Sequence, residues 1–302
     1  MKSILGSCAA AILIFPLTAP AVHVAGNAPN NTPPPDDPGF ANVGTLNGAS
    51  AVYLGGGWVI TASHVGVNAV TFGGVAYAPV PGSSVQLSNQ GTPGMILNTD
   101  IILFQLTSSP PLPDLSIRAS TPIAGDSVVM IGNGVSQNAA RSSWNVVQGP
   151  NENDDVWTPS PGGTVETFGS PGGQTIRWGT NNVEDFADID DNFGTVRSLV
   201  TVFNDDLLNR PDEAQAVLGD SGSGVFLKNG SAWELAGMIF AVGTLENYDN
   251  IPGGTTTSIL DSSVTYAADL SFYRTQILSV IPEPGTAALA GMALLGLLRR
   301  RR

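Results

Sequence analysis

The chain has 302 residues, of which 42% are hydrophobic and 12% are charged, and its net charge is −13. This length and apolar content can form one or two globular units, whereas the negative charge excludes a phosphate-backbone binder, which needs clustered Lys and Arg. The content of 36 glycines and 22 prolines predicts short strands joined by turns.

The first 21 residues have the three parts of a secretory signal peptide. Lys2 gives a basic start, residues 9–17 form an apolar run, and Ala19-Pro20-Ala21 places small residues at the cleavage position. The one cysteine, Cys8, lies inside this segment, so we expect no disulfide and no cysteine metal site in the mature protein. The folded domain is therefore expected to work outside the cytoplasm.

The domain itself is expected over residues 41–281. Residues 22–40 precede it, and their Asn and Pro content predicts an extended linker. Within the domain, short apolar runs alternate with Gly, Pro and Asn turns, as in all-β proteins built from barrels. Strands are expected over residues 51–54, 58–60, 69–72, 75–77, 101–106, 128–131, 175–178, 196–203, 225–227 and 233–242.

Two other stretches have their own patterns. Residues 134–173 are dominated by Gly, Asn, Ser and Pro, which predicts a long functional loop or a decorated hairpin. Residues 267–281 carry apolar positions along one helical face, which predicts a terminal helix.

Residues 184–192 are strongly acidic. Asp188, Asp190 and Asn192 have the alternation of the first ligands in an EF-hand loop, but the turn glycine and the bidentate glutamate that such a loop also needs are missing. We therefore expect a solvated acidic loop there and no metal site.

Three separated motifs could supply a nucleophile, a base and an orienting acid. His64 ends Thr61-Ala62-Ser63-His64, Asp100 opens Asp100-Ile101-Ile102-Leu103, and Ser221 lies in Gly219-Asp220-Ser221-Gly222. A serine hydroxyl needs a base within hydrogen-bond reach, and that base needs a third group to fix its tautomer. Each residue alone has an ordinary interpretation as a core histidine or a turn residue. The second histidine, His23, falls at the edge of the export signal, which leaves His64 as the base of the domain.

The three contexts and their order resemble the chymotrypsin-like (trypsin-family) serine peptidases, with T-A-A-H, D-I-x-L-L and G-D-S-G. The resemblance implies an all-β fold of two antiparallel six-stranded-type β-barrels, a short C-terminal helix and an active site between the barrels. It also implies that His64 exchanges a proton with Ser221, that Asp100 orients the imidazole, and that Gly219 and Ser221 donate backbone N–H groups to an oxyanion.

Other positions depart from the family pattern. Phe240 replaces a serine that supports the catalytic aspartate, and Val242 replaces a glycine that admits the substrate backbone. Counted back from Ser221 without gaps, Gln215 would form the base of the substrate pocket where trypsin has an aspartate, which predicts cleavage after uncharged side chains. No Ile-Val-Gly-Gly start is visible, so Asp220 lacks the amino-terminal partner that the family provides.

Residues 282–302 contain Pro282-Glu283-Pro284, an apolar run over residues 287–298 and four terminal arginines. They resemble the PEP-CTERM sorting signal of Gram-negative bacteria, which implies transient membrane insertion, removal by an exosortase and delivery to the cell surface or extracellular matrix. The run is shorter than the roughly 20 residues of a comfortable span. A plain C-terminal membrane anchor, with the arginines held on the cytoplasmic side, is the alternative.

These features predict an exported, surface-sorted serine endopeptidase that acts on a protein or peptide substrate without a cofactor. Its other expected partners are the export machinery and the exosortase, and nucleic acid is not expected to bind. The alternative is a catalytically impaired binding or matrix protein on the same scaffold, which Phe240 and Val242 favour.

Overall fold

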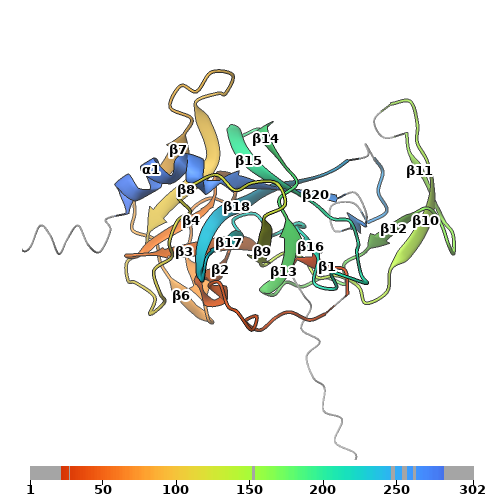
Figure 1. Cartoon of the computed structure of the whole chain (residues 1–302), viewed down its shortest axis with the longest axis horizontal. Coiled ribbons are helices and arrows are strands. Elements are labelled where there is room, and N and C mark those ends of the chain that lie inside the picture. Colours follow the sequence, from red (N-terminus) through yellow and green to blue (C-terminus); the bar gives the residue numbers. More distant parts are fainter. Residues whose placement is uncertain are drawn as a thin grey trace, which may run out of the picture.

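The computed structural model describes residues 22–281 apart from residues 27, 152–153, 246–248, 254–256 and 261–262. The described chain is mostly β-structure, and its strands pair antiparallel in four sheets (Figure 1). The expected all-β class is confirmed, and the expected terminal helix is α1, Leu270–Val280. The predicted signal peptide and the predicted membrane segment lie outside the described residues. No helix in the described part of the chain has the length and apolar character needed to cross a membrane.

Two seven-stranded sheets form most of the molecule, where the resemblance implied six-stranded barrels. The first has the order β6-β5-β2-β3-β4-β8-β7, and the second has the order β13-β9-β17-β18-β20-β15-β14. The strands of the first sheet are β2 (Val43–Leu46), β3 (Ala49–Gly55), β4 (Trp58–Ala62), β5 (Val70–Phe72), β6 (Val75–Tyr77), β7 (Val85–Ser88) and β8 (Asn98–Gln105). Those of the second are β9 (Ser127–Gly132), β13 (Arg177–Asn182), β14 (Asp185–Asp190), β15 (Thr195–Val202), β17 (Gly224–Asn229), β18 (Ala232–Thr244) and β20 (Ser263–Asp269).

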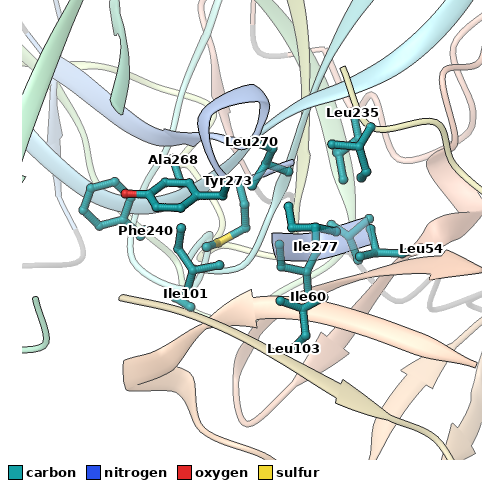
Figure 2. Close-up of a cluster of buried hydrophobic side chains, with 14 of the residues drawn as sticks. Leu54, Ile60, Ile101, Leu103, Leu235, Phe240, Ala268, Leu270, Tyr273 and Ile277 are labelled. Carbon is teal, nitrogen blue, oxygen red and sulfur yellow. The ribbon is translucent and has the colours of Figure 1, made fainter. Parts of the chain in front are cut away.

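The two large sheets and α1 share one hydrophobic core (Figure 2). Leu54 and Ile60 come from the first sheet, Phe240 comes from the second, and Tyr273 and Ile277 come from the helix. Each of these side chains is buried, and burying one large apolar side chain contributes about 1.5–3 kcal/mol. The shared core therefore holds the two halves of the chain together as one packed body.

The acidic stretch forms the edge strand β14, so the prediction of a solvated loop was wrong. β14 pairs with β15 along its whole length, and Phe186 and Ile189 pack partly against the hydrophobic core. Asp188 forms an ion pair with Arg197 at 2.7 Å. The acidic side chains of β14 suit an edge strand, because they discourage pairing with other chains. The prediction weighed the charges and neglected these two apolar side chains.

The predicted linker over residues 22–40 lies against the second sheet, so it is not a free spacer. Its first part forms β1 (His23–Val24), which pairs with β16 (Ala214–Gln215), and both residues of β1 are fully buried. Further along, the indole Nε1 of Trp178 donates to Thr32 O at 3.0 Å. The Asn and Pro content predicts an extended linker, but the buried valines and the polar contacts of this segment fix it to the domain.

Residues 134–173 follow the decorated-hairpin alternative. They contribute three strands to a four-stranded sheet of order β11-β10-β12-β19, which lies at the far side of the molecule from α1 (Figure 1). Its indole rings Trp144 and Trp157 pack edge to face at 6.2 Å. The strands are β10 (Ser142–Val147), β11 (Val156–Pro159), β12 (Val165–Phe168) and β19 (Ser258–Ile259), and the short 3-10 turn η1 spans Phe40–Asn42.

Candidate active site

His64 and Asp100 are brought together by two neighbouring strands of the first sheet. β4 and β8 pair with Ala62 opposite Ile101, so the turn η2 (Ser63–Val65) after β4 reaches the first residues of β8. His64 N donates to Asp100 Oδ1 at 2.8 Å, and His64 Nδ1 lies 2.6 Å from Asp100 Oδ2. Because a carboxylate only accepts, the proton sits on Nδ1, which leaves Nε2 as an acceptor.

Ser221 reaches the imidazole from a turn of the second half of the chain. Its Oγ lies 2.8 Å from His64 Nε2. Ser50 N donates to Ser221 O at 2.8 Å, and Gly222 N donates to Ile239 O at 2.7 Å, so both large sheets hold this turn. Gly222 has φ of +86°, and a Cβ there would lie 1.9 Å from Ser50 O, so only glycine fits. The structure therefore assembles the three residues that the motifs singled out.

The surroundings of His64 favour its protonated form. The hydrogen bond that His64 donates to Asp100 raises the pKa of His64, burial of the ring opposes this, and the charges of Asp100 and Asp191 add to the rise. The Asp100 side chain is fully buried, whereas 28% of the His64 side chain is exposed. The two carboxyl groups therefore stabilise the imidazolium form of His64.

Asp220 holds the Ser221 turn from inside the protein. Gly134 N donates to Asp220 Oδ1 at 2.8 Å and Val217 N donates to Oδ2 at 2.9 Å. Burial raises the pKa of Asp220 to about 7, against the effect of these hydrogen bonds and of the positive charge on Arg177. These two backbone amides hold the Asp220 carboxyl group in place beneath the Ser221 turn.

Gly219 and Ser221 leave their backbone N–H groups open to a ligand. Neither amide donates a hydrogen bond to another group within the described ranges. Gly219 has φ of +94°, and a Cβ there would lie 2.4 Å from Gln174 Nε2. The peptide that carries the Gly219 N–H is fixed through its carbonyl group, because Leu218 O accepts from Val135 N at 2.8 Å.

The three residues predicted for the substrate pocket occupy different environments. Gln215 is 1% exposed and lies in β16, where it pairs with His23 of β1. Phe240 is 4% exposed and packs in the shared core (Figure 2). Val242 is 52% exposed. Only Val242 is therefore at the surface, and the expected pocket base at Gln215 is buried in a strand that pairs with β1.

His23 belongs to the folded domain, which corrects its assignment to the edge of the export signal. It is fully buried in β1, and burial lowers its pKa to about 3. An imidazole with this pKa stays neutral near pH 7, so His23 does not compete with His64 as a base.

A polar cavity of about 450 Å³ lies beside Gly219. Gln174 connects the two, because its Nε2 donates to Gly48 O at 2.6 Å and to Asn133 O at 3.0 Å. Amide and hydroxyl groups dominate the wall, which suits a peptide backbone or an uncharged polar side chain. The lining residues are Thr45, Leu46, Asn47, Gly48, Asn68, Ala69, Thr71, Asn133 and Gln174.

The motifs gave no sign of two residues that lie at this site. Asp191 and Phe193 come from the turn between β14 and β15, and the Phe193 ring lies 5.6 Å from the His64 ring. Their only signal in the sequence was a position at the end of the acidic stretch. Contacts between distant segments of this kind leave no local pattern.

Residues 280–302 match the PEP-CTERM protein-sorting motif. This confirms the sorting signal predicted over residues 282–302 and marks the chain for export and surface sorting in a Gram-negative bacterium. The motif implies recognition by an exosortase.

No curated protein matches the sequence. Among solved structures, a mutant of human heparin binding protein (CAP37) is similar at 13% identity and a TM-score of 0.48, covering 82% of this chain and 94% of that chain. The Ser343Ala mutant of Rv3671c from M. tuberculosis H37Rv is similar at 16% identity and 0.42, covering 81% and 89%. The NS6 protease from murine norovirus 1 is similar at 13% identity and 0.39, covering 76% and 90%. These are chymotrypsin-like structures, the class that the sequence motifs resemble.

Proposed function

We propose that the chain is a serine endopeptidase in which Ser221 is the nucleophile, His64 the general base and Asp100 the group that orients it. The observation that carries this proposal is the continuous series of contacts from Asp100 Oδ2 to His64 Nδ1 at 2.6 Å and from His64 Nε2 to Ser221 Oγ at 2.8 Å. In this proposal each seven-stranded sheet corresponds to one barrel of a chymotrypsin-like pair.

The reaction begins when Ser221 Oγ attacks the carbonyl carbon of a peptide bond and His64 Nε2 takes the hydroxyl proton. The tetrahedral intermediate collapses as His64 returns that proton to the leaving nitrogen, which breaks the C–N bond and leaves an acyl ester on Ser221. Water then attacks the ester with His64 again as base, and protonation of Ser221 Oγ releases the acid. Asp100 stabilises the imidazolium in both halves.

The negative charge on the intermediate falls on the substrate oxygen. The open N–H groups of Gly219 and Ser221 would donate to it, and a single such donor is worth about a hundred- to a thousandfold in rate. The polar cavity beside Gly219 is placed to accept the segment that follows the scissile bond.

Substrates with an uncharged side chain before the scissile bond suit this site best. Gln215 is neutral and buried, so no carboxylate at this position would pair with Lys or Arg. A peptide-library profile measures this preference, and a profile dominated by basic residues would contradict it.

Labelling with a fluorophosphonate tests the nucleophile directly, because the probe phosphorylates only an activated serine. The wild-type domain should be labelled on the peptide that contains Ser221. Ser221→Ala and His64→Ala should lose the label, whereas Ser142→Ala, which changes an exposed serine of β10, should keep it. An unlabelled wild-type protein that is folded would reject the peptidase proposal.

One observation favours the alternative of a catalytically impaired binding or matrix protein. Gln215 is 1% exposed, so the expected pocket base is not open to solvent in this structure. The two functions separate in one measurement: an impaired protein would leave the probe unreacted, while an active peptidase with a shallow pocket would be labelled and would cleave peptides.

A further inference from the structure

A short turn from the second sheet lies against the His64 ring. It joins β14 to β15 and comprises residues 191–194. Asp191 Oδ1 accepts the backbone N–H groups of Phe193 at 2.7 Å and Gly194 at 2.8 Å, and Asp191 N donates to Gly194 O at 2.9 Å. These three bonds fix the backbone from which Phe193 projects.

The same turn is pressed onto the strand that carries Asp100. A Cβ on Gly194 would lie 2.2 Å from Asn98 O, so the two backbones are in direct contact two residues before Asp100. The neighbouring Thr195 accepts twice: Ile96 N donates to its Oγ1 at 3.1 Å, and Asn89 Nδ2 donates to its carbonyl oxygen at 2.9 Å. The turn is thereby anchored to the loop between β7 and β8.

Phe193 lies against the imidazole and is itself half exposed to solvent. The ring centroids of Phe193 and His64 lie 5.6 Å apart with the planes tilted by 45°. Phe193 remains 48% exposed, so its ring forms a cover over the site and does not fill the core. A neighbouring ring at this distance narrows the χ rotations open to His64, whose Nε2 must stay within reach of Ser221.

We propose that the 191–194 turn is a positioning element for the base, in which Phe193 restricts the rotation of His64 and Asp191 places a second carboxyl group beside the His64–Asp100 pair. This inference rests on the proposed peptidase function. Burial and the charge of Asp100 raise the pKa of Asp191, and the charge of Asp191 in turn raises the pKa of His64, which agrees with a close approach.

The chain offers a clean measurement, because it has two histidines and only one of them titrates near neutral pH. NMR can therefore follow the His64 imidazole alone in Phe193→Ala, Phe193→Leu and Asp191→Asn. Phe272→Ala is the matched control, since Phe272 is also half exposed but faces Tyr273 and Arg197.

In Phe193→Ala we expect the His64 ring signals to shift and broaden, and kcat to fall roughly ten- to a hundredfold with little change in KM, as for a misplaced catalytic group. Phe193→Leu should recover part of the loss. Asp191→Asn keeps an acceptor for the Phe193 and Gly194 amides but removes a charge, so the pKa of His64 and the acidic limb of the pH–rate profile should move to lower pH. The control should change none of these.

The NMR measurements can also be made in a Ser221→Ala background, which separates this inference from the peptidase proposal. A wild-type protein without hydrolysis or labelling would reject the peptidase function. Folded Phe193→Ala and Asp191→Asn variants whose His64 signals and titration match the wild type would overturn the positioning role, whatever the activity.

Discussion

Two buried carboxyl groups flank the site, one from each half of the chain, and they are satisfied in different ways. Asp100 on β8 accepts from the backbone N and the Nδ1 of His64, so its charge acts on a group that titrates. Asp220 accepts from the amides of Gly134 and Val217, so its carboxyl group fixes the backbone of the turn that carries Ser221. Equal burial therefore does not imply an equal role: in the proposed peptidase Asp100 orients the base, whereas Asp220 holds the nucleophile turn.

The largest effect is expected at Ser221, where the two halves meet. Ser221→Ala removes the nucleophile, and turnover should fall on the order of a million-fold if the three residues act as a unit. Peptide hydrolysis by purified variant protein measures this. Unchanged activity would show that the contact between Ser221 Oγ and His64 Nε2 is structural, and the comparison of the two carboxyl groups would then lose its chemical side.

The next effect separates the two carboxyl groups directly. Asp100→Asn should cost about ten-thousandfold in kcat with the fold kept, because the amide favours the wrong tautomer of His64. Asp220→Asn should mainly cost stability, on the order of 1–3 kcal/mol, because its new N–H group faces a backbone donor.

Steady-state kinetics and urea denaturation on both variants check this pair of expectations. Equal losses of kcat in folded Asp100→Asn and Asp220→Asn variants would contradict the different roles assigned to the two carboxyl groups.

A further prediction concerns how the free energy of unfolding depends on pH, where Asp220 and His23 should act in opposite directions. The pKa of Asp220 rises to about 7 on folding, so between about pH 4 and 7 the folded state keeps a proton that the unfolded chain has lost, and stability falls as pH rises. The pKa of His23 falls to about 3, so between about pH 3 and 6.5 the unfolded chain takes up a proton that the folded state refuses, and stability rises with pH.

Each shift corresponds to about 4–5 kcal/mol, so the wild-type profile should be nearly flat where the windows overlap. Asp220→Asn should leave a stability that rises across this range, and His23→Gln should leave one that falls. His64 does not change the slope below about pH 6.5. Its raised pKa contributes stability that is fully present there and is lost at higher pH. Urea denaturation at about pH 4.5, 5.5 and 6.5 measures the slopes, and two variants with the same slope would contradict the assignment.

Sequence motifs were sufficient for the elements whose signal is local. The T-A-S-H and G-D-S-G runs each place one side chain on a turn after a strand, and apolar runs predicted ten of the twenty strands in the described residues and the terminal helix. Two of the errors came from contacts between distant segments: β1 is held by a strand about 190 residues away, and Phe193 reaches His64 across the two sheets. The error at β14 was local, because its charges hid a hairpin with the neighbouring strand β15. Composition cannot show such pairings, because the same Asn, Pro and Asp residues also suit linkers and loops.

The smallest effect is expected at the C-terminal tail, which contrasts with the N-terminal segment. Residues 22–25 are buried against the second sheet, so deleting them should destabilise the domain by several kcal/mol, at roughly 1.5–3 kcal/mol for each lost valine.

Ending the chain after Ile281 should instead release a soluble protein whose rate of fluorophosphonate labelling is unchanged, because the match to the sorting motif covers residues 280–302 and the catalytic contacts all lie before it. In a host with the sorting machinery, the native protein should have lost this tail. Intact-mass measurement on surface-extracted protein decides the matter: a C terminus at Arg302 would support a plain membrane anchor and would reject removal by an exosortase.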